Sequence, residues 1–198
     1  MSQLEFLGIA NGLKWIPRSG WITHGVSLQD VESVADHTFS TCVISLLITD
    51  FERKRGVRVN VERVLRTATL HDLAEALTFD ISKSYLTYIG KRGAEIKKEI
   101  ETSAWNHLTR KIGSSKLSND YLKLQEEYSN NLTIEAQIVH AADSIDILLQ
   151  ILELRRRGYP TNSLKELWDE TIKQIKRTPI RSAKNLLKLV TEAERHLP

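Results

Sequence analysis

The segment Thr67–Thr78 places ionisable side chains where a helix needs apolar ones. Apolar residues upstream recur at helical spacing and predict a helix that begins near Asn60: Val61, Val64, Leu65 and Ala68. At the same spacing, the buried face continues through His71, Asp72 and Glu75. Burying charge is costly unless the charge is paired or coordinates a metal. The rest of the chain must therefore supply either partners for these charged groups or further ligands for a metal.

Two interpretations of the His71-Asp72 pair follow from the residues alone. Imidazole and carboxylate groups both ligate first-row divalent ions, so a metal site accounts for the cluster. Alternatively, the two residues form a buried hydrogen-bonded pair that only holds helices together, since a short motif alone is weak support for a function. Other ionisable residues on buried faces are needed to decide between them.

Composition limits the classes of protein to consider. The 198 residues suit one domain, 1–198, with a core over 14–155 and C-terminal helices over 163–196 packed on it. A hydrophobic content of 41% with 27% charged residues is typical of a globular chain. The net charge of only +3 argues against a chain that binds nucleic acid through its overall charge.

Three features predict a soluble cytoplasmic protein. The single cysteine, Cys42, excludes an intramolecular disulfide and fits a reducing compartment. The first residues show no basic region followed by an apolar one, so no secretory signal is expected. The apolar runs are far shorter than a membrane span, and no membrane association is predicted.

Helical spacing recurs along the chain, and no segment alternates with the period of a strand. We therefore predict an all-α domain, a bundle of six to eight helices. The expected helices cover 3–13, 33–55, 60–78, 94–112, 118–129, 134–157, 163–177 and 181–196. Residues 14–32 and 80–93 are expected to be irregular.

Two further helices carry ionisable residues on their apolar faces. Ser33 and Asp36 form a capping-box pattern that opens the second helix, and His37 then faces inward. Asp143 and His140 lie on the inward stripe of the helix that Thr133 caps. Two imidazoles and two carboxylates make a reasonable octahedral site for one divalent ion. Its expected ligands are His37, His71, Asp72 and Asp143, with Glu75 beside them.

The order His…His-Asp…Asp resembles the HD-domain metal-dependent phosphohydrolases, and this resemblance implies an HD-domain helical bundle. Further motifs are similar to the 5′-deoxynucleotidase type of HD protein: Gly20-Trp21, Gly25-Val26, Glu32-Ser-Val-Ala-Asp-His37, His71-Asp-Leu-Ala-Glu75, Asp80-Ile81, Glu127-Tyr128 and Glu135-Ala136. The resemblance covers roughly residues 14–155. It implies a phosphomonoesterase that hydrolyses (deoxy)ribonucleoside 5′-monophosphates with one divalent metal ion, which is Mn, Co, Mg, Ni, Fe or Zn.

The resemblance also implies roles for individual residues. It assigns metal ligation to His37, His71, Asp72 and Asp143, and a general-acid or proton-relay role to Glu75. Asp80 is expected to position the substrate and the attacking water. Substrate contacts are expected from Arg18 to the phosphate and from Trp21 to the sugar, and further ones are assigned to His37, Asp80 and Lys83.

Three positions depart from the pattern of that family. Ser19 and Gly20 separate Arg18 from Trp21, whereas the bacterial enzyme has Arg and Trp adjacent. Phe79 precedes Asp80 where the family usually has Gly. His140 stands where relatives tend to carry Lys, and we expect it near the phosphate or behind a ligand rather than on the metal.

Alternative functions remain open at this stage. Guanosine tetraphosphate hydrolases of the HD type carry Glu-Asp where this chain has Glu75-Ala76, which argues against that activity. A cyclic-nucleotide phosphodiesterase and a non-catalytic nucleotide-binding module are not excluded. A homodimer is also expected from the resemblance and from apolar residues on the last helix, Leu186, Leu187, Leu189 and Val190.

Overall fold

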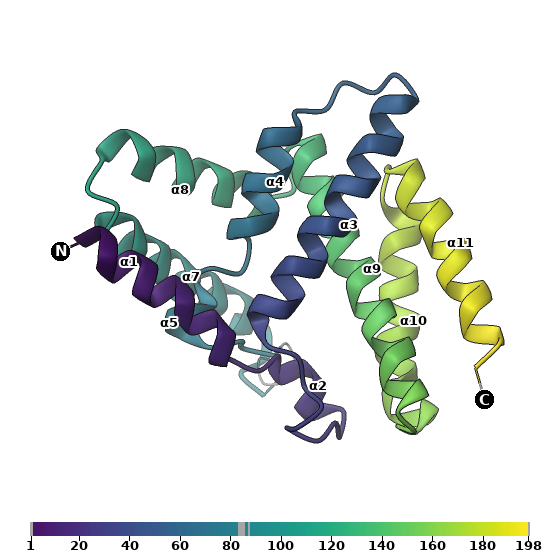
Figure 1. Cartoon of the computed structure of the whole chain (residues 1–198). Coiled ribbons are helices and arrows are strands. Elements are labelled where there is room, and N and C mark those ends of the chain that lie inside the picture. Colours follow the sequence, from purple (N-terminus) through teal and green to yellow (C-terminus); the bar gives the residue numbers. More distant parts are fainter. Residues whose placement is uncertain (1, 83–85, 87, 198) are drawn as a thin grey trace. The chain divides into compact units, whose positions relative to one another are not determined.

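The computed structural model describes residues 2–82, 86 and 88–197. The described residues are helical with no strand, so the all-α prediction is confirmed for them (Figure 1). They form two compact units, each built from two stretches of sequence. Unit 1 comprises residues 1–38 and 70–126, and unit 2 comprises residues 39–69 and 127–198.

Unit 1 carries the first part of the chain and the segment after Leu70. Its elements are α1 (Ser2–Asn11), η1 (Gly12–Trp15), α2 (Ser19–Thr23), the first turn of α3 (Val34–Lys54), α5 (Glu75–Thr78), η2 (Gly90–Arg92), α7 (Gly93–Arg110) and most of α8 (Ser115–Ser129). The expected irregular stretch 14–32 thus contains the short helix α2. Its five residues are too few for helical periodicity to reveal.

The core of unit 1 packs α1, η1 and α5 against α7. Its buried residues are Leu13, Ile16, Val34, Leu73, Ala74, Ala104, Trp105 and Leu108. Leu73 and Ala74 belong to the segment that carries His71 and Asp72. This packing therefore fixes the segment through its apolar flank while the ionisable flank faces elsewhere.

The segment from His71 to Ala74 is a turn, which corrects the expectation of one continuous helix over 60–78. Helix α4 (Val61–Leu70) ends before His71, and α5 begins at Glu75. Between them the backbone bonds run from residue i+3 to residue i: Leu73 N donates to Leu70 O over 3.0 Å, and Glu75 N donates to Asp72 O over 3.0 Å. This tighter winding brings side chains three residues apart onto one side.

Unit 2 contains the last three helices with parts of α3 and α4. Its helices α9 (Ile134–Arg156), α10 (Thr161–Arg177) and α11 (Arg181–Arg195) pack side by side (Figure 1). Thr133 caps α9 as predicted, because its Oγ1 accepts a hydrogen bond from Ala136 N over 3.1 Å. Ser182 N at the start of α11 donates to the buried Glu52 of α3 over 2.7 Å.

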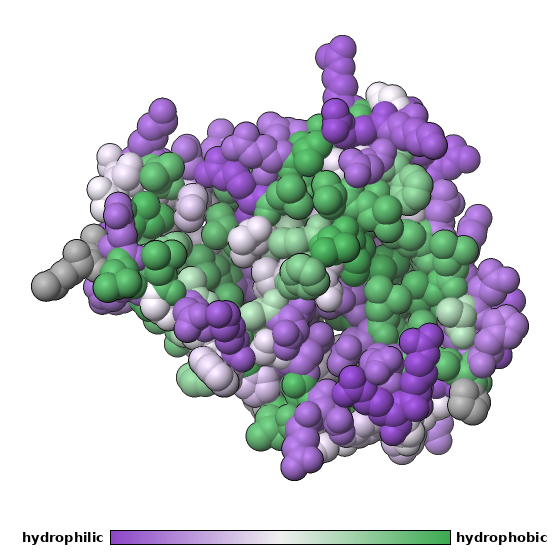
Figure 2. Space-filling view, viewed as in Figure 1, coloured by the Kyte–Doolittle hydropathy of each residue, from purple (hydrophilic) through white to green (hydrophobic). Residues whose placement is uncertain are grey.

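An apolar face of α3 is exposed within unit 2. Phe39, Val43, Leu47 and Phe51 follow one another at four-residue intervals, and each remains at least 44% exposed. Figure 2 shows apolar side chains gathered over α3. By contrast, Leu187 and Val190 of α11 are buried, and Leu189 is the exposed member of that predicted surface. The surplus of apolar side chains therefore lies on α3 rather than on α11.

None of the helices in the described parts of the chain is long and apolar enough to cross a membrane.

Candidate metal centre

The start of α3 is fixed by short-range bonds that also place Arg18. Ser33 and Asp36 form the predicted capping box, with Asp36 N donating to Ser33 Oγ over 3.1 Å and Ser33 N donating to Asp36 Oδ2 over 3.0 Å. Val34 N donates to Ile16 O, and Arg18 N donates to Glu32 O. Because these bonds hold residues 16–18 against residues 32–34, Arg18 reaches the first turn of α3, where His37 lies.

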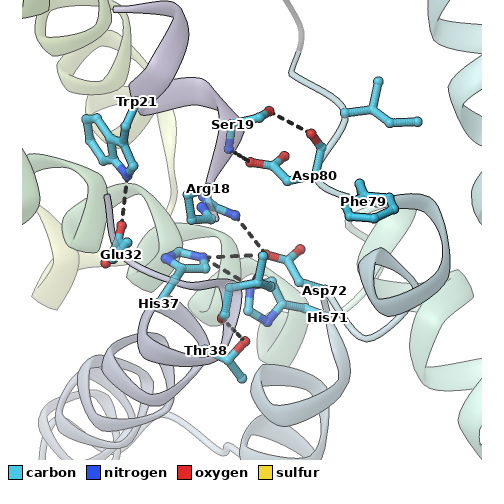
Figure 3. Close-up of polar contacts among 12 residues, drawn as sticks. Arg18, Ser19, Trp21, Glu32, His37, Thr38, His71, Asp72, Phe79 and Asp80 are labelled. Atoms are coloured by element: carbon cyan, nitrogen blue, oxygen red, sulfur yellow. Dashed lines mark hydrogen bonds and ion pairs between the residues drawn. The ribbon is translucent and has the colours of Figure 1, made fainter. Parts of the chain in front are cut away.

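Three side chains converge at this point: His37 from α3, and His71 and Asp72 from the turn (Figure 3). The Nε2 atoms of His37 and His71 are 3.3 Å apart. Asp72 Oδ2 lies 3.2 Å from His71 Nε2 and 3.6 Å from His37 Nε2. Both histidines are buried, so their ring nitrogens are shielded from bulk water.

These separations fit a shared divalent ion. Ligand atoms that each lie about 2.0–2.2 Å from one ion stand roughly 3–3.5 Å from one another. Two of the three distances above lie in that range and the third, 3.6 Å, is slightly longer, and the donors are the imidazole and carboxylate groups that first-row ions accept. The group can therefore hold a metal, which confirms the expectation of a metal site in its coarse form.

The electrostatics keep Asp72 ionised. Burial alone would raise the pKa of Asp72, but His71, Arg18 and His37 together lower that pKa well below its usual range. Arg18 Nη1 donates to Asp72 Oδ2 over 2.9 Å. The carboxylate is thus available as an anionic ligand throughout the physiological pH range, because a ligand to a divalent ion must be deprotonated.

Glu75 behaves in the opposite way although it lies only three residues further on. Burial and, to a smaller extent, the neighbouring carboxylates of Asp72 and Asp80 together raise the pKa of Glu75 to about 9. Its Oε2 atom is buried and accepts no hydrogen bond from the described residues. Two carboxyl groups in one cluster are therefore held in different protonation states in the metal-free protein, a common arrangement in acid–base sites.

Ser19 fixes Asp80 beside this cluster. Ser19 N donates to Asp80 Oδ2 over 2.7 Å, and Ser19 Oγ donates to Asp80 O over 2.6 Å. Arg18 and Ser19 are adjacent, so one short segment binds Asp72 through the first residue and Asp80 through the second (Figure 3). The sequence analysis did not identify Ser19 as a functional residue; its position directly after Arg18 was the available signal.

The other predicted contacts have different surroundings. Trp21 is buried, and its Nε1 donates to Glu32 Oε1 over 2.9 Å, a partner that the sequence analysis did not identify. Lys83 lies outside the described residues. In unit 2, Asp143 is half-buried on α9. His140 stacks on Tyr128 with ring centres 4.0 Å apart. The roles assigned to these residues stay predictions.

Comparison with known proteins gives consistent matches over most of the chain. Residues 10–185 match the family described as the HD domain. The 5′-deoxynucleotidase HDDC2 of Xenopus laevis is 32% identical over 179 residues, which are 90% of this chain and 82% of that protein. The protein of the same name from Homo sapiens is 31% identical over 170 residues, which are 86% of this chain and 76% of that protein.

A solved structure is similar to the same extent. The PH0347 protein from Pyrococcus horikoshii OT3 aligns with a TM-score of 0.78 and 32% identity, over 97% of this chain and 98% of that one.

The raised pKa of Glu75 predicts how the stability of the metal-free protein depends on pH. The pKa is 4.5 for an unperturbed glutamate and about 9 in the folded protein, so between these values the folded state binds the extra proton. Stability is then lost as pH rises through this window. Glu75→Gln removes the titrating group, so the variant should gain stability over the wild type by at least about 1 kcal/mol from pH 5 to pH 8.

Urea unfolding in the presence of a chelator measures this difference. Glu99→Gln, an exposed glutamate on α7 of the same unit, is the matched control and should show no such gain. An equal difference between Glu75→Gln and wild type at both pH values would show that Glu75 titrates normally.

Proposed function

This chain belongs to the HD-domain family, and we propose that it is a metal-dependent phosphomonoesterase that hydrolyses (deoxy)ribonucleoside 5′-monophosphates to nucleoside and phosphate. The observation that carries the proposal is the convergence of His37, His71 and Asp72 within 3.6 Å of one another. The curated relatives above are named 5′-deoxynucleotidases, which supports the substrate class.

We assign one divalent ion, Mn, Co, Mg, Ni, Fe or Zn, to His37, His71 and Asp72, with Asp143 as the fourth protein ligand. When bound, such an ion would supply Lewis-acid chemistry, which polarises a phosphoryl oxygen and makes water a better nucleophile at neutral pH. Both functions need a site that holds the ion firmly. The buried histidines and the ionised Asp72 meet that need.

Arg18 and Asp80 are the groups that we assign to the phosphate end of the substrate. Arg18 carries a planar guanidinium that binds phosphate oxygens in pairs, and its bond to Asp72 aims that group at the metal ligands. Asp80 is held by two hydrogen bonds from Ser19, so its carboxylate has a fixed position from which to orient the attacking water. Trp21, His37 and Lys83 are assigned to the remaining substrate contacts.

Glu75 is the group that we assign to proton transfer. The leaving 5′-oxygen of the nucleoside needs a proton when the P–O bond breaks, and a positioned carboxyl group can donate it. Glu75 lies one turn after Asp72, and its buried Oε2 atom is not committed to another partner among the described residues. This placement supports a role beside the metal rather than on it.

A phosphate-release screen tests the proposal. Purified protein with Mn, Co, Mg, Ni or Zn should release phosphate from deoxy- and ribonucleoside 5′-monophosphates, and a chelator should stop the release. Including cyclic nucleotides in the panel separates this activity from that of a phosphodiesterase. Nucleotide binding without phosphate release under any metal would contradict the proposal and favour a non-catalytic binding module.

Two variants assign the roles within the site. Asp72→Ala should lose both bound metal and activity, because it removes the charged ligand, and full metal content in this variant would refute the assignment. Glu75→Gln should keep metal and nucleotide binding while turnover falls by about 10²–10⁴, the usual contribution of general acid–base catalysis. Metal loss in Glu75→Gln would instead make Glu75 a ligand.

We also propose that the protein is a homodimer, joined through the apolar face of α3 formed by Phe39, Val43, Leu47 and Phe51. The run from Phe39 to Thr49 contains no charged residue, so it offers nothing to match a charged partner. A second copy presents the same uncharged surface, and a two-fold axis lets each stripe cover the other. Covering it would remove several large apolar side chains from water.

Light scattering tests the dimer. The wild type should have about twice the chain mass of 22.6 kDa, and Leu47→Glu should give the monomer, because it buries a carboxylate from each copy in the apolar interface. Leu189→Glu, at an exposed apolar position on a different helix, α11, should leave the dimer intact. A wild-type species of 22.6 kDa at micromolar concentration would contradict the proposal.

We place the protein in the cytoplasm. Its single cysteine, Cys42, is a free thiol with Sγ 3.6 Å from Thr69 Oγ1, and a chain with one free thiol and no disulfide fits a reducing compartment.

A further inference from the structure

Phe79 adopts a backbone conformation that phenylalanine normally avoids. It follows α5 with φ 58° and ψ 167°. This region of backbone space is essentially restricted to glycine, because a Cβ atom meets the neighbouring peptide groups there. A residue with a side chain persists in it when the surrounding structure imposes the conformation, and such residues concentrate at functional sites.

The surrounding bonds do impose it. On the N-terminal side, Phe79 N donates to Glu75 O over 2.9 Å. On the C-terminal side, Phe79 O accepts a hydrogen bond from Thr78 Oγ1 over 3.0 Å, and Asp80 is held through both its carboxylate and its carbonyl by Ser19. The peptide groups on both sides of Phe79 are therefore fixed, and the direction of its Cα–Cβ bond is fixed with them.

The phenyl ring of Phe79 is poorly packed against the protein. Phe79 is 67% exposed, and it is not among the residues of the buried core of unit 1. A glycine would adopt the same backbone without strain, and a polar residue would tolerate the exposure better. Packing therefore does not account for a phenyl ring at this position.

Phe79 lies beside the charged residues of the proposed active site. Phe79 directly precedes Asp80 and follows Glu75 by four residues, and Figure 3 draws it in the same group of side chains as Asp72 and Asp80. Arg18, which we assign to the phosphate, is bonded to Asp72 and is adjacent to the Ser19 that anchors Asp80. A monophosphate bound at Arg18 thus has Phe79 at the edge of its site, where the rest of the substrate must extend.

We propose that the ring of Phe79 is the platform on which the nucleobase of the substrate stacks. An aromatic ring stacks on any base, since every base has a π-face, and the interaction typically changes affinity by roughly 5- to 150-fold. The proposal rests on the proposed monophosphatase activity and adds a determinant to it. Phe79 selects phosphate esters that carry a base over base-free sugar phosphates, with little preference among the bases.

The test compares deoxyadenosine 5′-monophosphate with 2-deoxyribose 5-phosphate, which keeps the phosphate and the sugar but lacks the base. Phe79→Gly removes the ring and suits the positive φ, so the variant should fold. It should raise the KM for the nucleotide by about 5- to 150-fold with little change in kcat, because the ring acts on binding. The KM for the sugar phosphate should stay unchanged, and Phe79→Tyr should restore the wild-type value for the nucleotide.

Trp15→Ala is the matched control, since Trp15 is an exposed aromatic residue of the same unit without a positive φ, and it should change neither KM. An equal change in Phe79→Gly for both substrates would overturn the platform while leaving the monophosphatase activity in place.

Calorimetric binding of the same two ligands to the metal-loaded protein keeps the inference testable without turnover. If the wild type released no phosphate, the proposed function would fail, but stacking would still require tighter binding of the nucleotide in the wild type than in Phe79→Gly. Equal affinity of these two proteins for the nucleotide would overturn the proposal.

Discussion

The close approach of three ligand atoms is the constraint on which the site depends. Two imidazole nitrogens and one carboxylate oxygen from His37, His71 and Asp72 stand within 3.6 Å of one another, and both histidines are buried. A divalent ion satisfies all three atoms at once, and its binding free energy then becomes part of the stability of unit 1.

Hydrogen bonds between neighbouring segments position the residues around these three ligands. The capping box of α3 fixes His37, the bonds between residues 16–18 and 32–34 bring Arg18 to Asp72, and Ser19 then fixes Asp80. Phe79 adopts its strained backbone because the residues on both sides of it are held. His37, Asp72, the proposed phosphate contact Arg18 and the backbone of Phe79 are therefore positioned by hydrogen bonds between neighbouring segments of unit 1.

The sequence predicted the features that depend on local chemistry. The caps at Ser33 and Thr133 follow from side chains that bond their own helix, and the His71-Asp72 pair stands out because its charges interrupt an apolar pattern. The turn at His71 could not be seen, because over four residues a tighter helical winding leaves nearly the same apolar spacing. The bond from Trp21 to Glu32 depends on how a loop folds back, which periodicity does not report.

Periodicity also does not predict which helix carries the exposed apolar surface. The sequence predicted the surplus of apolar residues on the last helix, α11, because periodicity does not show which apolar side chains are covered when helices pack. In the structure, Leu187 and Val190 of α11 are buried, whereas Phe39 and Val43 of α3 are exposed. The exposed apolar surface therefore lies on α3.

Anomalous diffraction from crystals grown with Mn²⁺ would locate the metal ion directly. We expect one strong anomalous peak at coordination distance, about 2.0–2.3 Å, from His37 Nε2, His71 Nε2 and Asp72 Oδ2. Crystals of Asp72→Ala grown in the same way should lack this peak. A peak bound by other residues, or no peak among these three atoms at saturating Mn²⁺, would contradict the assignment of the metal and the mechanism that depends on it.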